Sequence, residues 1–273
     1  MTPYLICSDI DGTLMIDHKV MTAKTRQVLH QVMAQGHQFY LTTGRMLPLA
    51  HQVVTEIGGP VKVIAANGAT FEQGNQLKNS FLSGEHLTKI YQTVLSNNCR
   101  VYFFENNRLY YTGQTVPYQD EIATSGTHAT PVLNAMPLIG PEFLPNLTGY
   151  ITNAIVYGQP SELALVRQVL VQTTDLNLSS SNPHNLEIIP HSVNKALAVT
   201  AIQKYTGIGR DHTIVFGNEL NDLGMFRVAG HSVAMGNASN VVRQAATDIT
   251  LPNTEDGVAV FLQDFFKLNE NLA

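Results

Sequence analysis

The chain has 273 residues, of which 44% are hydrophobic, and carries a formal net charge of −5 at pH 7. This length fits one large or two modest domains. With only 16 basic residues, the chain lacks the dense positive surface that a nucleic-acid partner selects. No basic-then-apolar leader and no apolar stretch of membrane-spanning length is visible, so we expect a cytoplasmic protein without a membrane partner.

The amino-terminal part alternates between strand and helix patterns. The apolar run Tyr4–Cys7 is closed by two acids and a glycine, which predicts a buried strand ending in a turn. Apolar spacing and glycine stops predict the next elements: helix 22–35, strand 39–41, helix 47–57 and strand 61–66. Such alternation is the signature of a parallel sheet with helices on its faces.

From about residue 81 the pattern changes, and we expect a separate α+β domain at 83–185, inserted between 1–82 and 186–273. The elements predicted in it are helix 85–97, a hairpin of strands 100–104 and 108–112, strand 149–158 and helix 161–173, with 117–145 irregular. The first pattern then resumes with helix 194–205, strand 213–216, helix 220–228, strands 232–235 and 248–251, and a terminal helix from about 255. The predicted fold class is therefore α/β, a Rossmann-like parallel sheet core with helices on both faces, plus the α+β insertion.

Polar residues stand at the ends of the predicted strands of the α/β domain. They are Asp9 with Asp11, Thr43 with Gly44 and Arg45, Asn67, and Asn218 with Asn221 and Asp222. Lys195 begins the first helix after the insertion. In an open parallel sheet these strand ends converge on one crevice. A nucleophile, a cation, hydrogen-bond donors and a proton donor are the parts that phosphoryl transfer requires, and the oxygen ligands favour Mg²⁺.

This ordered set resembles the haloacid dehalogenase-like phosphatase superfamily, specifically its Cof-type branch. The resemblance spans essentially the whole chain. It rests on Asp9-x-Asp11-Gly12-Thr13, Thr43-Gly44-Arg45, Asn67-Gly68-Ala69, Lys195, Gly217-Asn218-x-x-Asn221-Asp222, Met235-Gly236-Asn237-Ala238 and Glu255-Asp256-Gly257-Val258.

The resemblance implies a role for each matching residue. Asp9 would be the nucleophile that becomes an aspartyl phosphate, and Asp11 would protonate the leaving oxygen and then activate water. Lys195 would act in catalysis by binding phosphate oxygens. The remaining phosphate- and substrate-binding residues would be Gly12, Thr43, Gly44, Arg45, Asn67 and Asn221. The residue beside Thr43, Thr42, stays an alternative to it. The metal residues would be Asp9, Asp11, Asn218 and Asp222, with Asp222 acting through metal-bound water or through Lys195.

One position departs from the family's pattern. The family usually has Asp where this chain has Asn218, so the predicted metal site lacks one negative charge. An amide oxygen can coordinate Mg²⁺, and we therefore expect weaker metal binding with the chemistry retained.

We expect a Mg²⁺-dependent phosphatase that hydrolyses a small phosphorylated metabolite, such as a sugar phosphate or a phosphorylated cofactor. The insertion would be the family's cap, which selects substrate and excludes water. Cap residues that could face substrate are Arg100, Tyr102, Arg108, Tyr110, Tyr111, Tyr150 and His184, although strand alternation puts about half of them on the wrong face. Two alternatives remain open, a phosphomutase-type phosphotransferase and a phosphate- or metal-binding regulatory protein. The sequence predicts no oligomeric state.

Overall fold

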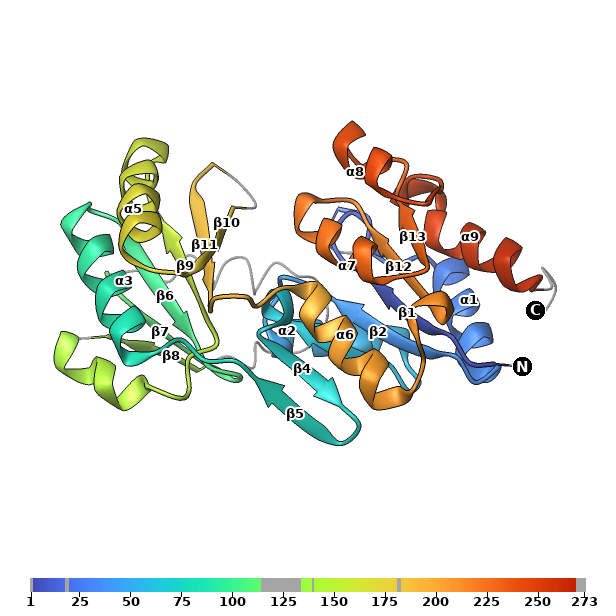
Figure 1. Ribbon diagram of the computed structural model, residues 1–273, viewed down its shortest axis with the longest axis horizontal. Helices are drawn as coiled ribbons and strands as arrows, with labels where there is room; N and C mark the ends of the chain where they lie inside the picture. The colour runs from blue at the N-terminus through green and yellow to red at the C-terminus, as the bar shows by residue number, and fades with distance from the viewer. Residues whose placement is uncertain (1, 18–19, 114–133, 139, 181–182, 269–273) are drawn as a thin grey trace. The chain divides into compact units, whose positions relative to one another are not determined.

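The computed structural model describes residues 2–17, 20–113, 134–138, 140–180 and 183–268 (Figure 1). The chain divides into two compact units. The first comprises Met1–Arg45, Leu49–Gln76 and Asn194–Ala273, and the second Met46–Pro48 and Leu77–Val193. The second unit therefore extends on both sides of the predicted insertion, 83–185.

The first unit is built on a sheet whose strands follow the order β14-β13-β12-β1-β2-β3-β4-β5. The parallel strands are β1 (Leu5–Ser8), β2 (Gln38–Thr42), β3 (Lys62–Ala65), β12 (Thr213–Gly217), β13 (His231–Ala234) and β14 (Asp248–Ile249). Strand β4 (Thr70–Gln73) runs antiparallel to β3 and is followed by β5 (Gln76–Asn79) at the edge of the sheet. The predicted parallel sheet is confirmed. The β4–β5 pair was not predicted, because its short, mostly polar strands carry no buried apolar pattern.

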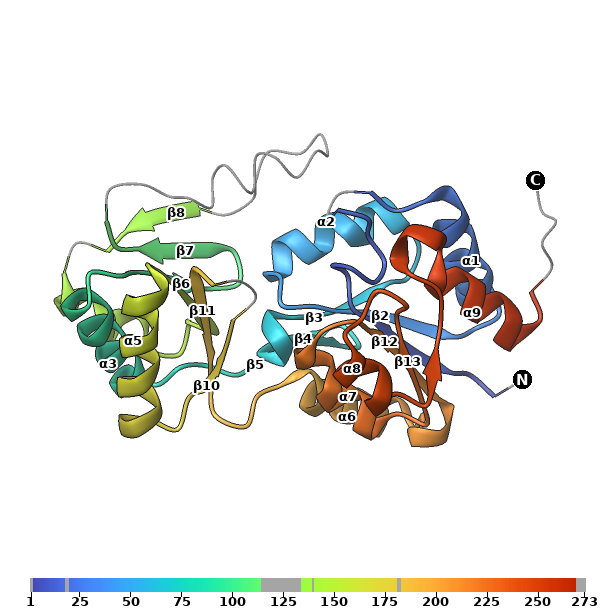
Figure 2. The same ribbon diagram turned by 90° about the horizontal axis from the view of Figure 1, so that it is seen from above.

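Helices cover both faces of this sheet, as predicted (Figure 2). One face carries α1 (Ala23–Ala34), α2 (Leu47–Ile57) and α9 (Gly257–Phe266), and the other carries α6 (Lys195–Thr206), α7 (Leu223–Val228) and α8 (Asn240–Ala245). Between the sheet and α6, a buried apolar core joins Leu5, Tyr40 and Val215 to Val199 and Ile202. Short 3₁₀ turns complete the unit, namely η1 (Ala66–Gly68), η3 (Arg210–His212), η4 (Leu220–Asp222) and η5 (Asn253–Glu255).

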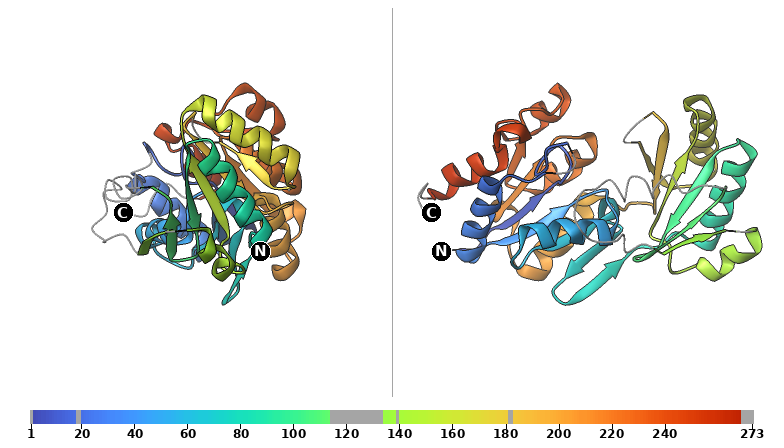
Figure 3. Two further views of the ribbon diagram at one scale, coloured as in Figure 1. Left: turned by 90° about the vertical axis from the view of Figure 1, so that its left-hand side faces the viewer. Right: turned by 180° about the vertical axis from the view of Figure 1, so that it is seen from behind.

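The second unit is an α+β unit whose sheet follows the order β10-β11-β9-β6-β7-β8. Its strands are β6 (Arg100–Phe104), β7 (Arg108–Tyr111), β8 (Asn134–Pro137), β9 (Asn153–Tyr157), β10 (Asn177–Ser179) and β11 (Asn185–Ile189). Helices α3 (Gly84–Ser96) and α5 (Pro160–Thr173) lie side by side on one face (Figure 3). Strand β8 lies within 117–145 and the 3₁₀ segment η2 (Pro141–Leu147) begins there, which corrects the prediction that this stretch is irregular; residues 114–133 and 139 lie outside the described part.

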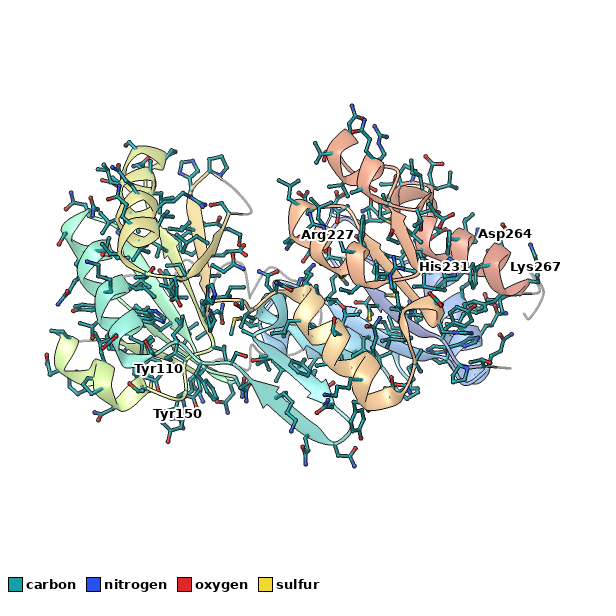
Figure 4. The ribbon with its side chains drawn as sticks, viewed as in Figure 1. Tyr110, Tyr150, Arg227, His231, Asp264 and Lys267 are labelled. Carbon is teal, nitrogen blue, oxygen red and sulfur yellow. The ribbon has the colours of Figure 1, made fainter. Side chains whose placement is uncertain are left out.

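The register of the second sheet places the candidate cap residues of β6 and β7 on opposite faces of that sheet. Tyr110 packs against the apolar core under the helices (Figure 4). Tyr102 pairs with Tyr111 across β6 and β7, and their rings stack with centroids 6.3 Å apart. Because Phe103 pairs with Tyr110 one position further on, Tyr102 and Tyr111 share the opposite face of the sheet.

Among the described residues, no helix is long and apolar enough to cross a bilayer.

Candidate active site

The candidate residues of the first unit follow the carboxyl ends of neighbouring parallel strands. Asp9 follows β1 and is held by its N–H, which donates to the carbonyl of Phe216 on β12 (3.0 Å). Thr43 follows β2, and its N–H donates to the carbonyl of Ile64 on β3 (2.8 Å). Pairing of these strands therefore brings the turns after β1, β2, β3 and β12 to one edge of the sheet.

A buried lysine lies between two carboxylates at this edge. The Nζ of Lys195 donates to Oδ1 of Asp9 (2.7 Å) and to Oδ1 of Asp222 (2.6 Å). Lys195 is 1% exposed, Asp9 6% and Asp222 0%. Lys195 is the first residue of α6, where the helix dipole disfavours a cation. The two carboxylates supply the charge that makes a buried ammonium tolerable there.

The three charges shift one another's protonation. Burial raises the pKa of Asp9, the Lys195 ammonium opposes that rise, and the nearby Asp222 adds to it. Burial disfavours the ammonium of Lys195, but the carboxylates of Asp222 and Asp9 outweigh it and raise the pKa of Lys195 above its ordinary value. Lys195 is therefore a cation at neutral pH, positioned to neutralise an oxyanion.

Asp222 organises the turn after β12 as well as Lys195. Its Oδ2 accepts the backbone N–H groups of Asn218 (2.9 Å) and Glu219 (3.0 Å). A Cβ on Gly217 would come within 2.5 Å of the Asp222 side chain, so glycine allows this close approach. Both carboxylate oxygens of Asp222 are therefore engaged, Oδ1 with Lys195 and Oδ2 with the turn.

Asp11 forms a bidentate ion pair with Arg45. Nε of Arg45 donates to Oδ2 of Asp11 (2.8 Å), and Nη2 donates to Oδ1 (2.5 Å). Arg45 is placed by its own N–H, which donates to the hydroxyl of Thr43 (3.0 Å). The alternative hydroxyl, that of Thr42, lies within β2 beside the thiol of Cys7.

Asn67 lies in the turn after β3, with a left-handed backbone (φ 52°). Its side-chain oxygen accepts a hydrogen bond from the amide of Asn221 (3.1 Å), and its carboxamide lies 3.4 Å from the position of a Cβ on Gly44. Gly68 has φ +97°, and a Cβ there would lie 2.3 Å from the carbonyl of Asn194. Glycine at 68 therefore lets this turn approach the start of α6, where Lys195 lies.

Asn218 packs against the turn that follows Asp9. The hydroxyl of Thr13 donates to its Oδ1 (2.9 Å), and its Nδ2 donates to Oε1 of the exposed Glu219 (3.5 Å). Gly12 has φ +73°, and a Cβ there would lie 2.5 Å from Nδ2 of Asn218. Gly12 thus makes room for the Asn218 side chain.

The donor set at this edge fits a hard divalent cation. Asp9 contributes a carboxylate, and Asn218 contributes an amide oxygen next to the turn that carries Asp11. Oxygen donors of this kind suit Mg²⁺, which is held in proteins by few carboxylates and keeps several waters. In the part of the chain that the structure describes, no three His, Cys, Asp or Glu side chains gather as a metal cluster.

Two asparagines that lie beside this edge had no role in the sequence analysis. Asn237 follows β13, and Asn253 begins η5. The amide of Asn237 donates to the carbonyl of Gly12 (2.9 Å), and that of Asn253 donates to the carbonyl of Met15 (2.7 Å). Asn237 stands within one of the motifs quoted above, and its place after a parallel strand is the signal that could have marked it.

The chain is similar to known phosphatases along nearly its full length. The sequence profile of the haloacid dehalogenase-like hydrolases matches residues 6–262. The 5-amino-6-(5-phospho-D-ribitylamino)uracil phosphatase YitU of Bacillus subtilis is 28% identical, over 97% of this chain and 98% of its own length. A putative phosphatase, YxeH, of the same organism is also 28% identical, over 93% and 95%.

The fold is shared with solved structures. A haloacid dehalogenase-like hydrolase from Bacteroides thetaiotaomicron superposes with a TM-score of 0.84 at 26% identity, covering 97% of this chain and 100% of the other. The chain therefore belongs to the haloacid dehalogenase-like hydrolase family. Within that family it is a phosphatase of the Cof type, as its sequence motifs predict.

Proposed function

We propose that the chain hydrolyses phosphate monoesters of small metabolites through an aspartyl phosphate on Asp9, with Mg²⁺ as cofactor. The observation that carries the proposal is the buried Lys195, whose ammonium lies 2.7 Å from Asp9 and 2.6 Å from Asp222. A buried cation beside a carboxylate at converging strand ends is a preorganised site for phosphate oxygens. Asp9, Asn218 and the backbone carbonyl of Asp11 would hold the metal, and Asp222 would act through metal-bound water or through Lys195. When bound, the metal supplies further neutralisation of phosphate charge.

The chemistry assigned to the protein has two steps. A carboxylate oxygen of Asp9 forms a bond to phosphorus while the ester P–O bond breaks, and the leaving oxygen receives the proton of Asp11. Water then attacks phosphorus, Asp11 takes up its proton, and the bond to Asp9 breaks to release inorganic phosphate. Lys195 stabilises the charge of the transferred group in both steps.

Asp222 is assigned a positioning role. Its oxygens accept Lys195 and two backbone N–H groups, so it orients the ammonium and the turn that presents Asn218. Thr43, Asn67, Asn221 and the glycines 12 and 44 are assigned to the phosphate pocket.

For the substrate, we propose a phosphorylated sugar or polyol. The Bacillus subtilis relatives YitU, YcsE and YwtE are phosphatases of 5-amino-6-(5-phospho-D-ribitylamino)uracil, which supports a primary polyol phosphate. We assign substrate selection to the second unit, whose sheet carries the half-buried Tyr111 on the face opposite α3 and α5, whereas Tyr102 on that face is fully buried.

The test is release of phosphate from p-nitrophenyl phosphate and from a panel of sugar and polyol phosphates, with and without Mg²⁺. Wild type should release phosphate in a Mg²⁺-dependent reaction, and Asp9→Asn should not. Release by Asp9→Asn at the wild-type rate would refute the assignment. Transfer of the phosphoryl group to an added sugar, with no net release, would favour the phosphotransferase.

A further inference from the structure

The turn that carries Asp11 is tied to the carboxy-terminal part of the chain by two side-chain amides. Nδ2 of Asn237 donates to the carbonyl of Gly12 (2.9 Å). Nδ2 of Asn253 donates to the carbonyl of Met15 (2.7 Å). The two residues are themselves joined, because the backbone N–H of Asn253 donates to Oδ1 of Asn237 (3.1 Å).

These bonds reach Asp11 through the backbone. The N–H groups of Thr13, Leu14 and Met15 all donate to the carbonyl of Ile10, which closes a tight turn after Asp9. Met15 also forms an isolated β-bridge with Asp11. The two bound carbonyls, those of Gly12 and Met15, therefore hold the turn directly after Asp11 and at its bridge partner.

The asparagines are held firmly by close backbone packing. A Cβ on Gly236 would lie 2.7 Å from the nitrogen of Pro252, so the turns after β13 and β14 meet directly there. The N–H of Gly236 also donates to the carbonyl of Leu251 (3.2 Å). Asn237 and Asn253 therefore extend from two turns that are in direct contact.

The same carboxy-terminal part of the chain also binds the far end of the segment that begins at Asp9. The Asp256 carboxylate accepts the hydroxyls of Thr22 and, at 3.0 Å, of Thr25 at the start of α1. The segment between β1 and α1 is therefore fixed near its beginning and at its end by residues 237–256.

We propose that Asn237 and Asn253 are positioning residues for the acid–base chemistry of Asp11. This inference rests on the proposed function. Their amides hold the carbonyls of Gly12 and Met15, which follow Asp11 in the same turn, so that the Asp11 carboxyl group keeps its position relative to the leaving oxygen. Small displacements of a proton donor cost rate even where substrate binding is unchanged.

Such a role predicts a dependence on the leaving group. A sugar or polyol phosphate expels an alkoxide and needs the proton of Asp11, whereas p-nitrophenyl phosphate expels a stable phenolate and needs it little. Asn237→Ala and Asn253→Ala should each lower kcat for an alkyl phosphate about tenfold or more, and lower kcat for the aryl phosphate less than about threefold. KM should change little for either ester.

Three further variants sharpen the test. Asn237→Asp keeps the acceptor for the Asn253 N–H but turns a carboxylate oxygen toward the Gly12 carbonyl. Its kcat for the alkyl phosphate should therefore fall at least as much as that of Asn237→Ala. Asn97→Ala is the matched control, because it removes an amide-to-carbonyl hydrogen bond (2.8 Å, to Thr93) in the second unit. Asp11→Asn sets the leaving-group selectivity expected when the acid itself is lost.

Hydrogen exchange tests independently of activity whether Asn237 and Asn253 anchor the turn that carries Asp11. In Asn237→Ala and Asn253→Ala the amides of Thr13, Leu14 and Met15 should exchange about tenfold faster than in wild type, with no change in Asn97→Ala. Unchanged exchange in this turn, or equal losses of kcat with both esters, would overturn the inference. If wild type hydrolyses neither ester, the proposed function fails, and exchange alone then decides whether the anchor exists.

Discussion

Arg45 binds Asp11 through two parallel hydrogen bonds, from Nε to Oδ2 (2.8 Å) and from Nη2 to Oδ1 (2.5 Å). The side chains are 18% and 27% exposed, so the pair is partly shielded from water. A fork of this kind fixes the plane of the carboxylate as well as its position. Arg45 therefore sets the orientation of the Asp11 carboxylate, the group that we propose as the acid and base.

Replacing Arg45 should reveal this orienting role. Arg45→Gln removes a charge-assisted pair worth about 1.5–3 kcal/mol, so kcat/KM with a sugar phosphate should fall about 10- to 100-fold. Arg45→Lys should regain only part of the loss, because an ammonium cannot form the fork. Steady-state kinetics of the three proteins provide the measurement. Full recovery by lysine would mean that charge alone matters at this position.

Lys195 should be essential to the fold of the site as well as to its chemistry. Lys195→Met leaves Asp9 and Asp222 buried without their cation, which should lower the free energy of unfolding by about 3–5 kcal/mol. The control is Lys267→Met, which breaks an ion pair with Asp264 at 2.8 Å whose side chains are 81% and 85% exposed (Figure 4). That variant should leave stability nearly unchanged. Equal effects in urea denaturation would argue against a buried charge cluster.

The amide at position 218 should limit metal affinity. Asn218→Asp adds the missing negative charge, so the Mg²⁺ concentration for half-maximal activity should fall, and calorimetry should record tighter Mg²⁺ binding. Glu219→Gln is the matched control, because it changes a neighbouring exposed carboxylate. If Asn218→Asp leaves the metal titration where it is in wild type, Asn218 is not a ligand.

The stability of the metal-free protein should depend on pH through Asp9. Burial raises the pKa of Asp9 from 3.8 to about 7, with Lys195 opposing the rise. Between these values the folded protein keeps a proton that the unfolded chain releases, so stability falls as pH rises from about 4 to about 7. Asp9→Asn should remove this contribution. Melting curves recorded with a chelator should therefore show the stability of the variant increasing relative to that of wild type as pH rises. A difference in melting temperature that does not depend on pH would contradict the raised pKa of Asp9.

The fold was largely predictable because its central strands are short, buried and apolar, and because helix patterns separate them. The α2 segment has the predicted bounds, Leu47–Ile57. The sequence did not predict β4, β5, β8, β10, β11, α8 and η2, all of which are short. Strand β11 is largely apolar and buried, but it falls at the predicted domain boundary. Tertiary pairing, which local sequence does not record, decides their structure.

The site was predictable to the level of strand ends and motifs. Asp9, Thr43, Asn67 and Asn218 follow their strands as the apolar patterns indicate. The contacts that define their roles were beyond reach, since they join positions far apart in the chain. The Asn237 amide, for example, binds the carbonyl of a residue 225 positions earlier. No spacing rule connects two such turns, and only the folded sheet brings them together.

The most direct test of the central claim is to locate the phosphoryl group on the protein. Asp11→Asn, which should form the intermediate with an aryl phosphate but release it slowly, is mixed with p-nitrophenyl phosphate and Mg²⁺, quenched in acid, digested and analysed by mass spectrometry. We predict one phosphorylated peptide, with the added group on Asp9. Phosphate release by wild type with no adduct on Asp9 in this variant, or an adduct on another residue, would contradict the account.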